Sequence, residues 1–271
     1  MPGAAGAARA LTVDIVGRGD SLVLVHGLAT TRSIWRHATP RLAATRQVVT
    51  LDVPGFGAAR PVGRGFDLED VAARVLEQLR ARRVPEPFEL VGHSMGGALA
   101  LTLAACAPDA VRSLVLVSPA GLRPIPPVLA AILGIAAEVY VPARRRAARL
   151  ASWSWGRRVL MAGGVSDGAA LDPAVVRQLV GASLGARRIG PALSAVASAD
   201  LRDVLAGLAA PVGAVWGRDD RVILPGGMRT VMALRPGAAC EVVDGAGHIS
   251  MVEQPDAFVA ALERVLVAIS A

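Results

Sequence analysis

Runs of consecutive apolar residues alternate along the chain with longer segments in which apolar residues recur every three or four positions. The continuous runs predict buried strands at Ser21–His26, Gln47–Leu51, Phe88–Val91, Val111–Val117, Val212–Trp216 and Cys240–Val243. The periodic segments predict amphipathic helices near Ser33–Ala43, Leu68–Arg82, Gly97–Ala105, Gly226–Ala233 and Pro255–Ile269. Apolar strands separated by helices are typical of an α/β fold, here a mostly parallel twisted sheet flanked by helices.

This alternation fails across residues 121–208, where helical pieces are broken by prolines and by Gly163-Gly164 and no strand pattern occurs. We therefore predict a core formed by residues 1–120 and 209–271 and an inserted helical cap formed by residues 121–208. Such an insertion is expected to act as a lid over the active edge of the sheet. Its apolar residues, in Val128–Val141 and at Trp153, Trp155 and Met161, indicate either an acyl pocket or ordinary core packing.

Composition indicates a folded protein, because 53% of the 271 residues are hydrophobic and 19% are charged. The formal charge is +7 and every basic residue is arginine, which a GC-rich coding bias explains. Nucleic-acid binding is not expected, because it favours a stripe of positive charge interleaved with aromatic residues, and aromatic residues make up only 3% of the chain. Six arginines of the insertion indicate a solvated helix face, or else a docking surface for an acidic acyl-carrier protein or a coenzyme A thioester: Arg144, Arg145, Arg146, Arg149, Arg157 and Arg158.

The two cysteines, Cys106 and Cys240, form no C-x-x-C pair, so neither a disulfide framework nor a metal site is expected, and no cofactor is expected either. The segment from Met1 to Gly6 lacks the apolar core of a signal peptide. The apolar stretch from Ile125 to Val141 contains prolines and Glu138, and it falls short of a membrane span. These features indicate a cytoplasmic protein without a transmembrane segment.

A nucleophile elbow is indicated at Gly92–Gly96, which reads Gly-His-Ser-Met-Gly. The motif follows the apolar run Phe88–Val91 and precedes the small-residue helical run Gly97–Leu101. In such a strand–turn–helix the glycines allow close approach of the neighbouring elements, and the serine hydroxyl is raised above the edge of the sheet. Ser94 is therefore the candidate nucleophile.

A base and an acid are expected beyond the ends of later strands, because ligand sites in parallel sheets form at the carboxyl edge. His248 follows the last predicted strand in a loop rich in glycine and is the candidate base. Asp219 and Asp220 both follow the preceding strand, and only one of two neighbouring side chains can reach His248. We favour Asp220 and interpret Asp219 as a residue that caps or that pairs with Arg218 or Arg221.

Two backbone N–H groups are candidates for an oxyanion hole. One belongs to Met95, the residue after the nucleophile, at the start of a helix whose dipole favours negative charge. The other belongs to Leu28, which follows the strand that ends at His26-Gly27. We interpret His26 as a structural residue that holds this loop.

The motifs together resemble the α/β-hydrolase fold superfamily, most closely its capped esterase, haloperoxidase-like and carbon–carbon-bond hydrolase branch. The residues that carry the resemblance are Val25–Leu28, Asp52–Gly57, Gly92–Gly97, Gly217–Asp220 and Gly247-His248. The resemblance implies a nucleophile at Ser94, an acid at Asp220, a base at His248, and an oxyanion hole from Leu28 and Met95. The chain departs from the family at Ala58 and Ala59, where a small hydroxyl residue is common, and it has no His-Gly-Gly-Pro-Gly run.

These residues predict a serine hydrolase that cleaves a carboxylic ester of modest, apolar character through an acyl-enzyme intermediate. The same site would serve a thioesterase or cyclase, a carbon–carbon-bond hydrolase or a cofactor-free lyase. A third hypothesis is a ligand-binding member of the fold without activity. The expected partner is a small acyl substrate, free or attached to an acidic carrier.

Overall fold

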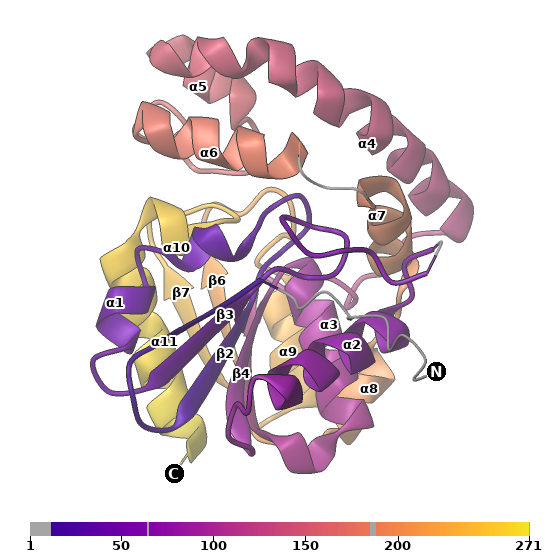
Figure 1. The fold of residues 1–271 in the computed structure, drawn as a ribbon, viewed down its shortest axis with the longest axis vertical. Coiled ribbons are helices and arrows are strands. Elements are labelled where there is room, and N and C mark those ends of the chain that lie inside the picture. Colours follow the sequence, from indigo (N-terminus) through magenta and orange to yellow (C-terminus); the bar gives the residue numbers. More distant parts are fainter. Residues whose placement is uncertain (1–11, 64, 185–187, 271) are drawn as a thin grey trace, which may run out of the picture.

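Seven strands form one sheet through the centre of the molecule, with helices on both of its faces (Figure 1). The structure is a computed structural model that describes residues 12–63, 65–184 and 188–270. The strand order is β1-β3-β2-β4-β5-β6-β7, and every neighbouring pair is parallel except β1 with β3. The strands are β1 (Val13–Val16), β2 (Ser21–Val25), β3 (Gln47–Leu51), β4 (Phe88–His93), β5 (Val111–Val117), β6 (Val212–Gly217) and β7 (Ala239–Val243).

The predicted α/β fold class is confirmed, and all six predicted strands are present within two residues of their expected bounds. Strands β2, β4 and β6 are buried along their whole length because helices cover both faces of the sheet. The pattern gives no indication of β1, a four-residue edge strand with three exposed residues, whose pairing with β3 is set by tertiary contact.

Helices α2, α3, α8 and α9 lie on one face of the sheet, and α1 and α11 lie on the other (Figure 1). Asp67 begins α2 by accepting the backbone N–H groups of Glu69 and Asp70. The predicted helix Ser33–Ala43 is instead two short pieces, and Pro40 lies in the first turn of the second. The elements are η1 (Arg32–Trp35), α1 (Thr39–Leu42), α2 (Leu68–Ala81), α3 (Met95–Cys106), η2 (Pro108–Ala110), α8 (Arg202–Gly207), α9 (Gly227–Leu234), α10 (Ser250–Glu253) and α11 (Pro255–Ser270).

Residues 121–208, called the inserted segment below, contain helices and no strand within their described part, and α4, α5, α6 and α7 lie over one edge of the sheet (Figure 1). Their bounds are α4 (Pro127–Ala147), η3 (Ala148–Ser152), α5 (Ser154–Leu160), α6 (Pro173–Leu184) and α7 (Ile189–Ser198). The division of the chain into a core and a cap at these residue numbers stays a prediction.

The expectation that the large apolar residues of α4 line a pocket or pack in the core is wrong. Val128, Ile132, Ile135 and Val139 are all exposed. The reason is a close approach of α4 to α7: a Cβ on Gly134 would stand 2.7 Å from the carbonyl oxygen of Gly190. Small residues therefore occupy the contact, and the large ones remain outside it.

The aromatic residues of the inserted segment also differ from expectation. Trp153 and Trp155 are exposed and stack on each other, with ring centroids 6.3 Å apart, whereas Met161 is buried in the core. Cys106 and Cys240 are free thiols. Residues 1–11, on which the interpretation of the N-terminus depends, lie outside the described residues. Within the described part of the chain, no helix has the length and apolar character needed to cross a membrane.

Candidate active site

Ser94 lies in a strained turn between β4 and α3. Its φ is 54° and its ψ is −118°, a conformation that residues with a side chain rarely adopt. The two motif glycines make this turn possible: a Cβ on Gly92 would stand 2.3 Å from the carbonyl oxygen of Gly96, and a Cβ on Gly96 would stand 2.4 Å from that of Val25. The geometry is that of the predicted nucleophile elbow.

His248 and Asp220 form a buried hydrogen-bonded pair, with 2.8 Å between Nδ1 of the imidazole and Oδ2 of the carboxylate. The other oxygen of Asp220 accepts the backbone N–H groups of Val222 and Ile223, at 2.9 Å each. Burial acts to raise the pKa of Asp220, but the hydrogen bond and charge of His248 and the Ile223 N–H outweigh it and lower the pKa. Asp219 is exposed, so the structure pairs His248 with the carboxylate that the sequence analysis favours.

The side chains of Ser94 and His248 line one cavity of about 470 Å³ at the carboxyl edge of the sheet. Because Asp220 holds Nδ1, Nε2 is the ring nitrogen of His248 that remains for proton transfer. The other walls are mostly apolar and come from loops, from the end of β6 and from α7 and α9: Leu28, Pro119, Ala120, Gly121, Leu122, Arg123, Ile125, Leu193, Val196, Ala197, Trp216, Val222, Ile223, Leu224 and Gly227.

Of the two predicted oxyanion donors, Leu28 lines the same cavity as Ser94, and Met95 is the first residue of α3, directly after Ser94. Neither the Leu28 N–H nor the Met95 N–H donates to a backbone acceptor within the described residues. The carbonyl of Gly27 is held at 2.8 Å by both the Nδ1–H of His26 and the hydroxyl of Thr30. Because the C=O and N–H of a trans peptide point in opposite directions, this leaves the Leu28 N–H on the far side of the peptide. His26 thus holds the loop, in agreement with its structural interpretation.

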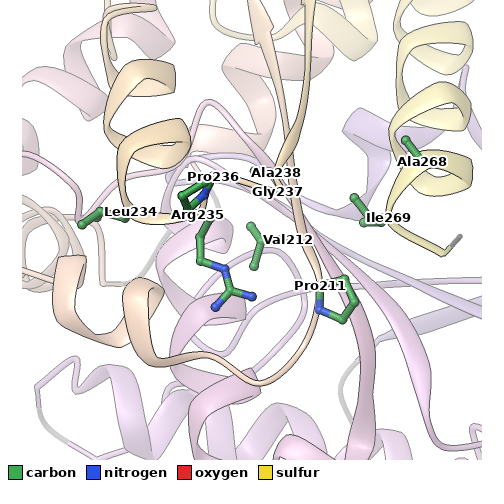
Figure 2. Close-up of a pocket in the computed structure, with 9 residues that line it drawn as sticks. All are labelled: Pro211, Val212, Leu234, Arg235, Pro236, Gly237, Ala238, Ala268 and Ile269. Atoms are coloured by element: carbon green, nitrogen blue, oxygen red, sulfur yellow. The ribbon is translucent and has the colours of Figure 1, made fainter.

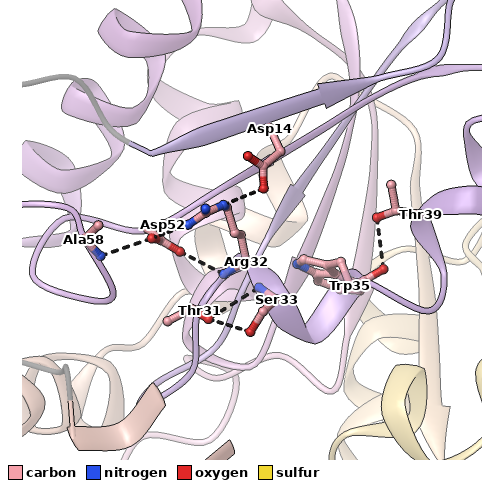
Figure 3. Close-up of polar contacts among 8 residues, drawn as sticks. All are labelled: Asp14, Thr31, Arg32, Ser33, Trp35, Thr39, Asp52 and Ala58. Carbon is pink, nitrogen blue, oxygen red and sulfur yellow. Dashed lines mark hydrogen bonds and ion pairs between the residues drawn. The ribbon is translucent and has the colours of Figure 1, made fainter. Parts of the chain in front are cut away.

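Arg32 and Asp52 join the loop after β2 to the loop after β3 (Figure 3). The buried carboxylate of Asp52 accepts the Arg32 N–H at 3.0 Å, the Arg32 Nη1 at 2.7 Å and the Ala58 N–H at 3.1 Å. The Arg32 Nε donates to Asp14 on β1 at 2.6 Å. Sequence reasoning identifies the motif that contains Asp52 but not this ion pair, because its partners lie 18 and 20 residues away from Arg32.

Two further residues hold the loop that carries His248, and sequence reasoning missed both. The imidazole of His93 donates from Nε2 to the carbonyl of His248 at 2.9 Å. The carboxylate of Glu253 accepts the Gly247 N–H at 3.0 Å and the Ser166 N–H at 2.7 Å. The His248 N–H in turn donates to the carbonyl of Gly164 at 3.1 Å. The loop of the candidate base is therefore tied directly to the inserted segment.

Replacing Glu253 with glutamine is expected to loosen this junction, because an amide offers one acceptor oxygen where the carboxylate uses two. Hydrogen bonds to a charged group contribute roughly 1.5–3 kcal/mol. We expect the free energy of unfolding to fall by about 2 kcal/mol and kcat for ester hydrolysis to fall by about tenfold. Urea denaturation and steady-state kinetics measure the two effects, with the exposed Glu77→Gln as the control. Unchanged values in both measurements would contradict the assignment.

Burial makes His26 and His93 resist protonation: it lowers the pKa of His26 to about 4 and that of His93 to about 3. An unfolded chain protonates both near pH 6.5, so it binds more protons than the folded chain at lower pH. The stabilisation from the neutral rings is thus complete above pH 6.5 and is lost as the pH falls toward 4. We expect the free energy of unfolding to fall by about 1.4 kcal/mol per pH unit for each histidine in this range. Denaturation curves from pH 7 to 4.5 test this, and the slope should be shallower in His93→Gln; equal slopes would refute it.

A second hollow lies at the opposite edge of the sheet, where β6 and β7 begin (Figure 2). The guanidinium of Arg235 donates there to the carbonyls of Ala206, Leu208 and Ala210. These contacts hold the end of α8 and the loop before β6 in place, so this arginine has a structural role. Within the described residues no three His, Cys, Asp or Glu side chains are grouped so that they could hold a metal ion.

Comparisons with known proteins agree with this fold. The sequence model of the Alpha/beta hydrolase family matches residues 22–261. The pimeloyl-acyl-carrier-protein methyl ester esterase of Methylococcus capsulatus is 32% identical over 249 residues, which cover 88% of this chain and 91% of that relative. A dihydrolipoyllysine-residue acetyltransferase component of an acetoin cleaving system, from Pseudomonas putida, is 44% identical over 105 residues, which span 38% of this chain and 28% of that protein. The structure of an enol-lactonase from Burkholderia xenovorans LB400 has the same fold, with a TM-score of 0.77, 22% identity, and coverage of 95% of this chain and 96% of that one.

Proposed function

The chain belongs to the alpha/beta hydrolase family, and on that premise we propose that it is a serine hydrolase that cleaves a carboxylic ester. The observation that carries the proposal is the hydrogen bond between Asp220 and His248. The imidazole of His248 lines the same cavity as the strained Ser94. A carboxylate that fixes the imidazole, and an imidazole that shares a cavity with an elbow serine, are the parts that acyl transfer requires.

In the proposed reaction the hydroxyl of Ser94 attacks the ester carbonyl while Nε2 of His248 takes the hydroxyl proton. The tetrahedral oxyanion is stabilised by the N–H groups of Leu28 and Met95. His248 then gives its proton to the leaving alcohol, and the acyl group remains on Ser94. Water, deprotonated by the same imidazole, attacks the acyl carbonyl, and the proton returns to the Ser94 oxygen as the carboxylic acid leaves. Asp220 keeps Nδ1 protonated throughout.

The proposal is tested by incubating the folded protein with a fluorophosphonate probe and with p-nitrophenyl esters of short and medium chain length. We expect one probe adduct per chain, located on Ser94 by peptide mass analysis, and loss of esterase activity in proportion to labelling. A folded protein that turns over no ester and leaves Ser94 unlabelled would overturn the proposal and favour a binding role.

A second candidate is hydrolysis of an ester whose acyl chain is attached to an acidic carrier protein. Two observations favour it. The relative from Methylococcus capsulatus is a pimeloyl-acyl-carrier-protein methyl ester esterase, and the inserted segment of this chain is positively charged, with eleven arginines and five acidic residues. Arg146 and Arg149 are exposed there, while Arg144 donates to the carbonyl of Leu160 and the side chain of Arg145 lies outside the description. Replacing Arg146 and Arg149 with glutamine should raise KM for a carrier-bound ester but not for the free ester. Equal KM values before and after replacement would exclude carrier docking at this surface.

A further inference from the structure

The cavity that holds Ser94 and His248 has one permanently charged residue in its wall, Arg123. The rest of the lining is almost wholly aliphatic, apart from Trp216 and the two candidate catalytic side chains. An apolar wall takes up a hydrocarbon chain without regard to what lies at the chain's far end. A single charged side chain in such a wall therefore determines which terminal group of the substrate chain binds there.

Arg123 lies in the loop between β5 and α4, and because it is exposed while it lines the cavity, it marks the side of the cavity that opens to solvent. Its side chain reaches across to the start of α9: its Nη1 is 3.9 Å from the position that a Cβ on Gly226 would take. Val222 and Leu224 line the same opening and are 55% and 56% exposed. The opening thus combines exposed aliphatic surface with a guanidinium that faces solvent.

The guanidinium of Arg123 makes no hydrogen bond or ion pair with any residue that the structure describes. This distinguishes it from the arginines with structural roles, such as Arg235, which donates to three carbonyls, and Arg32, which is paired with Asp52. A guanidinium offers five donors in a planar fork that fits a carboxylate or phosphate. Because no described residue accepts a hydrogen bond from the Arg123 guanidinium, all five of its N–H donors can bind a ligand.

We propose that Arg123 forms an anion-binding subsite, and that the substrates are esters whose apolar chain ends in a carboxylate or a phosphate. The inference rests on the proposed function and names the substrate class for the same site. The chain runs along the aliphatic walls from the ester at Ser94 to the opening, and its terminal anion meets the guanidinium. Because Arg123 is already exposed, binding there does not require the burial of an unpaired charge.

The expected effect follows from the distance of the anion from the reacting bond. A contact that is the same in the ground state and in the transition state lowers KM and leaves kcat unchanged. Loss of such a charge-assisted contact at a partly exposed site should raise KM by about tenfold. Neutral esters of equal chain length make no such contact, so their KM should not depend on Arg123.

The experiment compares four methyl esters of equal chain length: a fatty acid methyl ester, a dicarboxylic acid monomethyl ester, an ω-phosphate analogue and an ω-trimethylammonium analogue. Each is assayed with the wild type, Arg123→Gln, Arg123→Glu and the control Arg229→Gln, which removes an exposed arginine of α9 that does not line the cavity. We expect Arg123→Gln to raise KM for the anionic esters alone, and Arg123→Glu to reverse the preference toward a trimethylammonium-terminated ester. The carboxylate and phosphate arms show which anion fits.

Equal KM changes for neutral and anionic esters, or equal changes in Arg229→Gln, would overturn the subsite. Calorimetric titration of Ser94→Ala with the same esters measures binding without turnover, and it should show the same dependence on Arg123. If the wild type hydrolyses no ester but binding still depends on Arg123, the proposed function fails and the subsite stands. If hydrolysis depends on Ser94 but not on Arg123, the subsite alone fails.

Discussion

Replacing Ser94 with alanine is expected to lower kcat for ester hydrolysis by about ten-thousand-fold or more, because the alanine removes the atom that forms the acyl-enzyme. The remaining rate would reflect water in a cavity that still has the oxyanion donors of Leu28 and Met95. KM should change little, because the walls of the cavity are intact. Initial rates with p-nitrophenyl esters over a range of substrate concentrations measure both constants.

The matched control is Ser113→Ala, which removes a buried hydroxyl in β5 that has no hydrogen-bond partner among the described residues. It should leave kcat within about twofold of the wild type. Ser94→Gly adds a physical test of the elbow, because glycine adopts a φ of 54° without the strain that serine carries. We expect Ser94→Gly to be inactive and more stable by about 1 kcal/mol in urea denaturation. Full activity in either Ser94 variant would exclude the mechanism.

Most of the sheet was predictable because its strands are short, apolar and separated by helices of different periodicity. The run Val111–Val117 forms β5 with the predicted bounds, and its last four residues, Leu114–Val117, are all apolar and buried, as expected of a strand covered on both faces. The edge strand β1 differs, because three of its four residues face solvent and its pairing depends on the position of β3. A local pattern contains no information on such a pairing.

Helix α4 shows that an apolar sequence pattern does not determine which side chains are buried. Its apolar content predicted burial, yet burial depends on which neighbour is close enough to cover a side chain. At the contact with α7 the glycines Gly134 and Gly190 bring the two backbones together, so the large residues of α4 lie elsewhere. Composition alone does not distinguish a helix that buries its large residues from one that buries its small ones.

The residues proposed for catalysis were predictable because each follows directly from a recognisable local context. The residues that hold them in place were not. His93 and His248 are 155 residues apart, and Glu253 meets Ser166 across 87 residues. The identity of His93 within the elbow motif gave no signal for its hydrogen bond, and Glu253 is an ordinary helical residue in sequence. Such contacts depend on how loops from distant parts of the chain meet at the carboxyl edge of the sheet.

Replacing Asp220 with asparagine is expected to lower kcat by about a thousandfold to ten-thousandfold with little change in fold. The asparagine oxygen can still accept the Val222 and Ile223 N–H groups that hold the carboxylate now. Its amide NH₂ then faces Nδ1 of His248, so that Nδ1 becomes an acceptor and the ring proton moves to Nε2. An imidazole in that tautomer cannot take the proton of Ser94. Because Asp219 is the adjacent carboxylate and points to solvent, Asp219→Asn is a control with the same charge change, and its kcat should stay within about twofold of the wild type. A loss of activity in Asp219→Asn without one in Asp220→Asn would show that the pairing with His248 is not the one that the reaction uses.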